Sequence, residues 1–149
     1  GTTLYQKDLP VDTAKEIIAW AKQRNIHLNL YLDDKLYVEQ DWDTVRKYIK
    51  GKFVNFNVCP FESLELKNVN KLLAIDYSDA KRVTAWVEEL GEKFPELYIV
   101  KSTPYFCEFT NPLAHKGEAL RFLAEYYENQ FENALNTILY HSARIVKGI

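Results

Sequence analysis

The chain has 149 residues, of which 47% are hydrophobic and 14% aromatic, so it can bury an ordinary core in one domain. Its formal net charge is -2 with both signs interspersed, which excludes the basic stripe of a nucleic-acid-binding surface. No apolar run approaches the ~20 residues that span a bilayer, and no signal peptide opens the chain. We therefore expect a cytoplasmic protein without nucleic-acid or membrane partners.

The first half of the chain predicts helices and strands in alternation. These expected elements are, in chain order, an edge strand over 1–9, a helix from Pro10 to Asn25, a hairpin over 26–40, a short helix capped by Asp41 and ended by Gly51, and a strand over 53–58.

The second half continues in the same way and ends in a helical stripe. Its expected elements are a buried strand over 71–77, a long helix capped by Ser78 or Asp79, a hairpin over 97–110, a helix opened by Lys116, and an amphipathic helix over 130–147. Hairpins mixed with helices predict the α+β class, here a mainly antiparallel sheet with helices packed on one face and an extra C-terminal helix.

Cysteine and histidine positions give no sign of a metal site. Cys59 and Cys107 stand in apolar surroundings without metal-type spacing, which favours two reduced core cysteines over a disulfide. His27 and His141 have no cysteine or carboxylate partner at metal spacing. The sequence also has no methionine and begins with Gly1, from which we expect a processed, excised or engineered piece.

The segment from Asn111 to Leu120 places Lys116 at the expected opening of an amphipathic helix, directly after a hairpin. A helix N-terminus offers free N–H groups and partial positive charge, so this placement suits a phosphate. The alternative is an ordinary solvated lysine in the first turn of a helix.

Several segments, in collinear order over residues 1–127, resemble the Cof-type branch of the haloacid dehalogenase-like phosphatases. They are Thr3-Leu4-Tyr5 with Leu9-Pro10, the hairpin from Leu30 to Glu39, the strand Lys71-Leu72-Leu73-Ala74-Ile75, the stretch from Pro104 to Phe109, and His115-Lys116-Gly117-Glu118-Ala119-Leu120. In that family a large α+β cap is inserted into a Rossmann-like catalytic core. The resemblance implies a single domain over 1–149, with a cap over 1–127 and an unrelated or remodelled amphipathic helix over 128–149.

The resemblance also implies a chemistry and the parts that it needs. Family members hydrolyse phosphate esters through an aspartyl-phosphate, with magnesium held by acidic motifs, and the lysine that matches Lys116 would steady the transferring phosphoryl group. Neither the Asp-x-Asp motif nor the downstream acidic motif is found here. Asp41-Trp42-Asp43 has the letters of the first motif, but no hydrophobic strand precedes it and no Gly-Thr follows it. We expect a non-catalytic, excised or engineered cap of a sugar-phosphate phosphatase, with no cofactor in this chain although the parent would use magnesium.

A cap of this kind selects the leaving group of a small phosphorylated metabolite. The residues that the resemblance suggests for substrate binding are His27, Asn29, Tyr31, Asn111 and His115. The first three share the polar face of a strand whose other face carries Leu28, Leu30 and Leu32. The alternative for this polar face is a solvated sheet surface, which is common in antiparallel sheets.

Two other functions stay open. The chain could be a magnesium-dependent phosphatase fragment whose catalytic acids come from another chain, or an engineered chimera that associates with itself. The second possibility rests on the apolar stripe over 130–147, which includes Phe131, Leu135 and Ile138. That stripe either packs back on its own chain or forms a homodimer.

Overall fold

The computed structural model describes residues 8–146, with the side chains of residues 8–114 and 123–142. The chain divides into two compact units, Gly1–Ala114 and His115–Ile149. The edge strand expected over 1–9 lies almost wholly outside the described residues. In the described part of the chain, no helix combines the length and the apolar character that crossing a bilayer requires.

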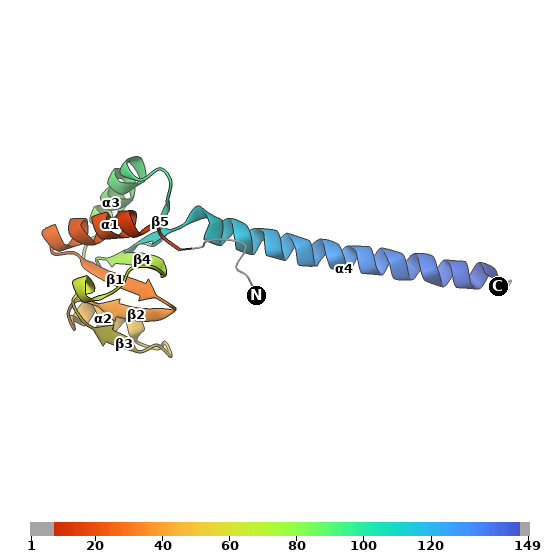
Figure 1. Ribbon diagram of the computed structural model, residues 1–149, viewed down its shortest axis with the longest axis horizontal. Helices are drawn as coiled ribbons and strands as arrows, with labels where there is room; N and C mark the ends of the chain where they lie inside the picture. The colour runs from red at the N-terminus through yellow and green to blue at the C-terminus, as the bar shows by residue number, and fades with distance from the viewer. Residues whose placement is uncertain (1–7, 147–149) are drawn as a thin grey trace. The chain divides into compact units, whose positions relative to one another are not determined.

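The described residues of the first unit contain one six-stranded sheet in the order β3-β2-β1-β4-β6-β5 (Figure 1). Its strands are β1 (His27–Leu32), β2 (Lys35–Val38), β3 (Phe56–Val58), β4 (Val69–Ile75), β5 (Tyr98–Thr103) and β6 (Phe106–Thr110). The pairing of β2 with β3 is parallel, and the other pairings are antiparallel. The α+β class and the mainly antiparallel sheet are therefore confirmed.

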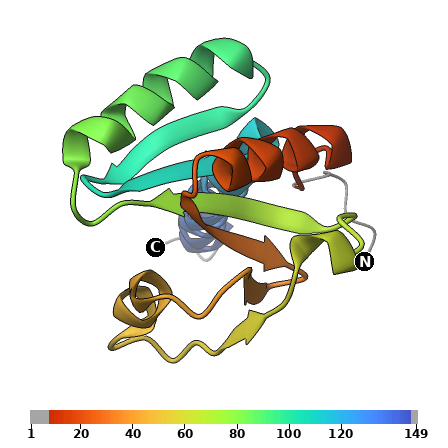
Figure 2. The same cartoon turned by 90° about the vertical axis from the view of Figure 1, so that its left-hand side faces the viewer.

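Helices cover both faces of this sheet to different extents (Figure 2). The two longer helices, α1 (Val11–Gln23) and α3 (Ala80–Lys93), pack on one face, as expected from the sequence. The short helix α2 (Asp43–Ile49) packs on the other face, against β1, β2 and part of β4. A single 3-10 turn, η1 (Phe61–Ser63), lies between β3 and β4. The face under α1 and α3 is called the first face below, and the face under α2 the second.

The alternation of β1 decides which side chains enter which layer. Leu28, Leu30 and Leu32 point into the layer beneath α1 and α3, where the rings of Trp20 and Trp86 meet edge to face at 5.6 Å. The strand alternation and helical stripes of the sequence predict that one set of apolar side chains is buried: Leu28, Leu30, Val54, Phe56, Leu73, Ile75, Val83, Val87, Leu90 and Leu120. Burial is confirmed at Leu28, Leu30, Leu73, Ile75, Val83 and Leu90. Val87 is half-buried, and Leu120 lies outside the described side chains.

The strand expected over 53–58 is shorter than predicted. Only Phe56–Val58 pairs with β2, so Val54 stands outside the sheet with 37% of its surface exposed and Phe56 is half-buried. The prediction that Val54 is buried is wrong, because alternation alone does not show where a strand loses its neighbour.

The helix α3 has the side-chain cap that the sequence predicts, whereas α2 does not. The Asp79 carboxylate accepts from the backbone N–H groups of Lys81 and Arg82, both at 3.1 Å, and caps α3. The expected cap of α2 by Asp41 is wrong, because Trp42 occupies that position without a side-chain hydrogen bond. Asp41 instead accepts two hydrogen bonds from Arg46, at 2.7 and 2.6 Å.

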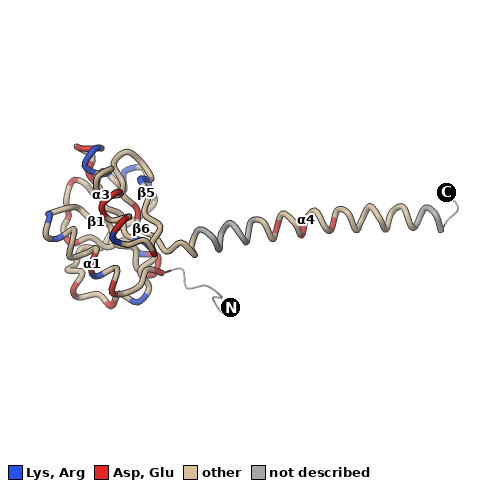
Figure 3. Tube along the Cα trace, turned by 90° about the horizontal axis from the view of Figure 1, so that it is seen from above, with Lys and Arg blue, Asp and Glu red and all other residues tan. Residues whose placement is uncertain are grey.

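Acidic and basic residues are interspersed along the chain of the first unit (Figure 3), in line with the small net charge. The second unit contains one element, the helix α4 (Pro112–Val146), which begins at the end of the first unit. Two separate helices, opened by Lys116 and spanning 130–147, were expected here. That expectation is wrong, because a single helix runs through both.

Candidate functional site

The chain enters and leaves the first unit at adjacent points. The N–H of Leu9 donates to the carbonyl of Val69 at 2.8 Å, which places the incoming chain beside the start of β4. The Asn111 amide donates to the Asp8 carbonyl at 2.9 Å, and the Asn70 amide donates to the Asp8 carboxylate at 3.2 Å. Asn111, a candidate for substrate binding, thus has a structural role in joining the incoming and outgoing segments.

The helix α4 starts before Lys116, so this lysine does not lie at the helix N-terminus. The helix begins at Pro112, and the side-chain oxygen of Asn111 accepts from the N–H of Leu113 at 2.9 Å. Lys116 therefore does not open the helix but follows its first turn, beyond the free N–H groups of the N-terminus. The expected opening position is wrong for this reason. The side chains of His115 and Lys116 lie outside the described ones, so their roles stay predictions.

His27 and Asn29 form a buried pair on the second face. The exposed fractions are 5% for His27 and 0% for Asn29, and the His27 Nε2 lies 2.6 Å from the Asn29 Oδ1. The indole of Trp42, at the start of α2, lies 5.6 Å from the His27 ring. A solvated sheet face, the alternative expected from the sequence, is wrong at these two positions because Trp42 and α2 cover this part of the sheet.

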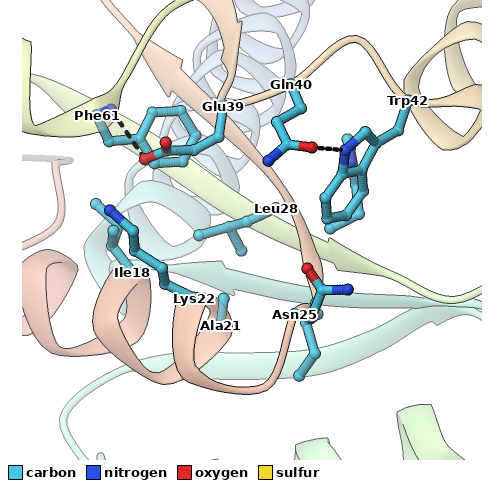
Figure 4. A pocket seen from close by; sticks show the side chains of 11 residues that line it. Ile18, Ala21, Lys22, Asn25, Leu28, Glu39, Gln40, Trp42 and Phe61 are labelled. Carbon is cyan, nitrogen blue, oxygen red and sulfur yellow. Dashed lines mark hydrogen bonds between the residues drawn. The ribbon is translucent and has the colours of Figure 1, made fainter.

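A cavity of about 90 Å³ lies between the end of α1, the start of β1 and the loop after β2 (Figure 4). Its wall contains apolar side chains such as Ile18 and Leu28 and polar ones that have partners within the protein. The Glu39 carboxylate accepts from the N–H of Phe61 at 2.9 Å, and the Lys22 ammonium donates to Glu62 at 3.0 Å.

The register of the sheet places this cavity far from the adjacent segments at Asp8 and Asn111. His27, which lines it, pairs with Ile75 at the end of β4, whereas the incoming chain meets Val69 at the start of β4. The cavity and the His27–Asn29 pair therefore belong to the end of the sheet opposite the connecting segments.

Burial lowers the pKa of His27 below its ordinary value of 6.5, and the hydrogen bond with Asn29 opposes this only in part. The unfolded chain therefore binds more protons than the folded chain as the pH falls through 6.5 toward the lowered pKa. We expect the free energy of unfolding to decrease over this interval and the His27→Gln variant to show a smaller decrease, measured by urea denaturation at several pH values.

The control for this measurement is His141→Gln, because His141 is exposed on α4. This variant is expected to keep the pH dependence of the unmodified chain. Equal pH dependence in the His27→Gln variant and the unmodified chain would contradict the assignment to His27.

Tyr31 belongs to a different place on the second face, near the start of β4. Its hydroxyl lies 2.5 Å from that of Tyr48, and the Lys71 ammonium lies 4.7 Å from the centre of its ring. Lys71 also forms an ion pair with Glu108 on β6, at 3.8 Å. Burial raises the pKa of Tyr31, and the Tyr48 hydrogen bond and the Glu108 charge raise it further. These four residues, Tyr31, Tyr48, Lys71 and Glu108, are called the Lys71 cluster below.

Lys71 and Glu108 are not among the site residues that the sequence predicts. The signal was present in the alternation of β6, where Glu108 stands between the buried Cys107 and Phe109 and so faces the other way. The structure thus separates the three polar residues of β1: His27 and Asn29 are joined at one end, and Tyr31 joins the Lys71 cluster.

No three His, Cys, Asp or Glu side chains lie together as a metal-ligand set among residues 8–114 and 123–142. Both cysteines are free, as expected, and burial raises the pKa of Cys107 to about 12.

Comparison with known proteins gives matches over most of the chain. Residues 1–136 match the family described as haloacid dehalogenase-like hydrolase. A Haemophilus influenzae protein described as a candidate phosphatase is 26% identical over 121 residues, which are 79% of this chain and 44% of that protein.

Solved structures share the fold. A crystal structure of a Thermotoga maritima protein has a TM-score of 0.68 at 35% identity, over 81% of this chain and 46% of the other. A haloacid dehalogenase-like hydrolase from Bacteroides thetaiotaomicron has a TM-score of 0.69 at 20% identity, over 84% of this chain and 47% of the other. The chain thus spans less than half the length of these relatives.

Proposed function

The chain belongs to the haloacid dehalogenase-like hydrolase family, in its Cof-type branch, and we propose that its first unit is the cap of a phosphatase. In this proposal the cap covers a phosphate-ester site, excludes water from it and selects the leaving group. The nucleophile and the magnesium ligands belong to the catalytic core of a complete family member, so the cap alone has no turnover.

The sheet topology supports a cap rather than a catalytic core. A Rossmann-like core, which the resemblance assigns to this family, is built on a mainly parallel sheet with crossover helices. The sheet of the first unit instead has β2–β3 as its parallel pairing and antiparallel pairings elsewhere in the described residues. Hairpins connect β1 to β2 and β5 to β6, as in an α+β module.

The observation that carries the proposal is the contact between Asp8 and Asn111. An inserted module must begin and end at nearly the same place, because the host chain is interrupted at one point. The hydrogen bond from the Asn111 amide to the Asp8 carbonyl holds the two connecting segments 2.9 Å apart at that contact, although 103 positions separate them in sequence. The first unit thus has the geometry of an insert.

A chimera tests this proposal. Residues 8–111 replace the aligned segment of a phosphatase of the same family whose activity toward sugar phosphates has been measured. We expect p-nitrophenyl phosphate hydrolysis to stay within about tenfold of the host's rate, because this small substrate makes few contacts with a cap. The order of kcat/KM values among sugar phosphates is expected to change.

The 149-residue chain alone is the control and should hydrolyse none of these esters with magnesium, because it contains neither acidic motif of the family. An unchanged order of sugar-phosphate preference in an active chimera would contradict the proposed function. So would magnesium-dependent turnover that copurifies with the chain alone.

A further inference from the structure

Within the described part of the first unit, the second face of the sheet is not covered by α1, α2 or α3 at the positions beside the connecting segments. On the first face, α1 and α3 cover the strands, and on the second face α2 covers β1, β2 and part of β4. The remaining second-face positions near the start of β4 and the end of β6 include Lys71 and Glu108, whose side chains are 35% and 21% exposed. Lys71 follows Val69 by two positions, and Val69 holds the incoming chain.

We propose that Lys71, Glu108 and Tyr31 bind the hydroxyl groups of a polyhydroxylated leaving group, such as the sugar or polyol part of a phosphate ester. This inference rests on the proposed function, because it assigns the residues with which the cap selects its substrate. It replaces His27 and Asn29, which the sequence suggested, because both are buried at the opposite end of the sheet.

The spacing of the ion pair leaves hydrogen-bonding capacity for a ligand. At 3.8 Å, the Lys71 ammonium and the Glu108 carboxylate are too far apart for a direct hydrogen bond. A hydroxyl group can lie between such groups, accepting from the ammonium and donating to the carboxylate. A carboxylate can also accept from two neighbouring hydroxyls at once, which is the arrangement that a sugar or polyol offers.

The rest of the cluster favours a neutral, hydroxyl-rich group over a second anion or an apolar group. The opposite charges of Lys71 and Glu108 cancel, so the cluster has no excess positive charge to attract an additional phosphate. The hydroxyls of Tyr31 and Tyr48, 2.5 Å apart, add a donor and acceptor pair at its edge. The Tyr31 ring, beneath the Lys71 ammonium at 4.7 Å, holds that charge over the sheet.

Titration of the full 149-residue chain tests the inference, with amide NMR signals as the measurement and sorbitol 6-phosphate and phenyl phosphate as probes. Both probes carry one phosphate, but only the first carries hydroxyl groups on its leaving group. We expect sorbitol 6-phosphate to shift the signals of Lys71 and Glu108 with a dissociation constant of about 1–10 mM. Phenyl phosphate is expected to bind at least about fivefold more weakly.

The variants Glu108→Gln and Lys71→Met are each expected to weaken sorbitol 6-phosphate binding at least about fivefold, since each removes one charged hydrogen-bonding partner. Glu16→Gln is the matched control, because Glu16 is also in a lysine ion pair, with Lys93 at 4.0 Å, and lies on α1 at the first face. It should leave binding unchanged. Thermal melts show which variants are folded, and either folded cluster variant suffices for the comparison.

Equal affinity for the two probes, no shift at about 50 mM sorbitol 6-phosphate, or equal loss in Glu16→Gln would overturn the inference. These outcomes are distinct from a failure of the proposed function. A chimera whose sugar-phosphate preference changes while Glu108→Gln leaves binding intact would keep the cap and reject this assignment. An active chimera with unchanged preference would reject the cap itself.

Discussion

Replacing Leu30 with alanine is expected to lower the free energy of unfolding by about 2–5 kcal/mol. Leu30 is fully buried in the centre of the sheet, beneath α1 and α3. Its strand neighbours are Tyr37 on β2 and Leu72 on β4. Truncation removes apolar contacts and leaves a cavity that neighbours fixed on two strands cannot easily fill. Urea denaturation followed by circular dichroism measures the change.

Val58→Ala is the control for this prediction, because Val58 is 50% exposed on the edge strand β3. Its expected effect is below about 0.5 kcal/mol. Ile75→Ala should resemble Leu30→Ala, since Ile75 is 3% exposed in the layer under α2. A change below about 0.5 kcal/mol at both Leu30 and Ile75 would mean that the strand registers are wrong.

Replacing Leu135 and Ile138 together with aspartate is expected to lower the melting temperature of a monomeric chain by several degrees, at about 2–4 °C per kcal/mol lost. Both residues belong to the apolar stripe of α4, and the second unit contains no other described element that could cover this stripe. An uncovered helix of this kind is only marginally stable in water. In the structure Leu135 and Ile138 are 42% and 61% exposed. Packing of the stripe within its own chain, which the sequence favours over a symmetric dimer, stays a prediction.

The matched control is Asn129→Asp with Asn133→Asp, which adds the same two negative charges to α4 outside the stripe. It should leave the melting temperature nearly unchanged. Light scattering measures the mass of both variants and of the unmodified chain. A native dimer that becomes a well-folded monomer after the Leu135 and Ile138 changes would show that the stripe joins two chains instead.

Much of the first unit follows from local patterns in the sequence. The alternation of β1 predicts its two faces, and Asp79 predicts the start of α3, because each is a short-range effect of side-chain direction or a local hydrogen bond. The family is also confirmed, since residues 1–136 match the haloacid dehalogenase-like hydrolases.

The site depends on long-range packing and is less predictable. The polar side chains of His27 and Asn29 read as a solvated face, but the position of α2 buries them. Lys71 and Glu108 lie 37 positions apart in sequence, and they meet only because β4 and β6 pair in the observed register. The sequence pattern predicts the start of α4 too late, because Pro112 and its cap Asn111 begin the helix before the apolar stripe starts.

The adjacent segments at Asp8 and Asn111 have a mechanical consequence. In the complete phosphatase that we propose, two neighbouring connections would act as a hinge, about which the first unit would swing relative to the catalytic core through small torsional changes. Residues near the two connections would then move little, whereas residues at the opposite end of the sheet would move farthest. The Lys71 cluster lies close to the pivot and would keep its place through such a motion. The cavity beside His27 lies at the far end, where any opening of the module would be largest.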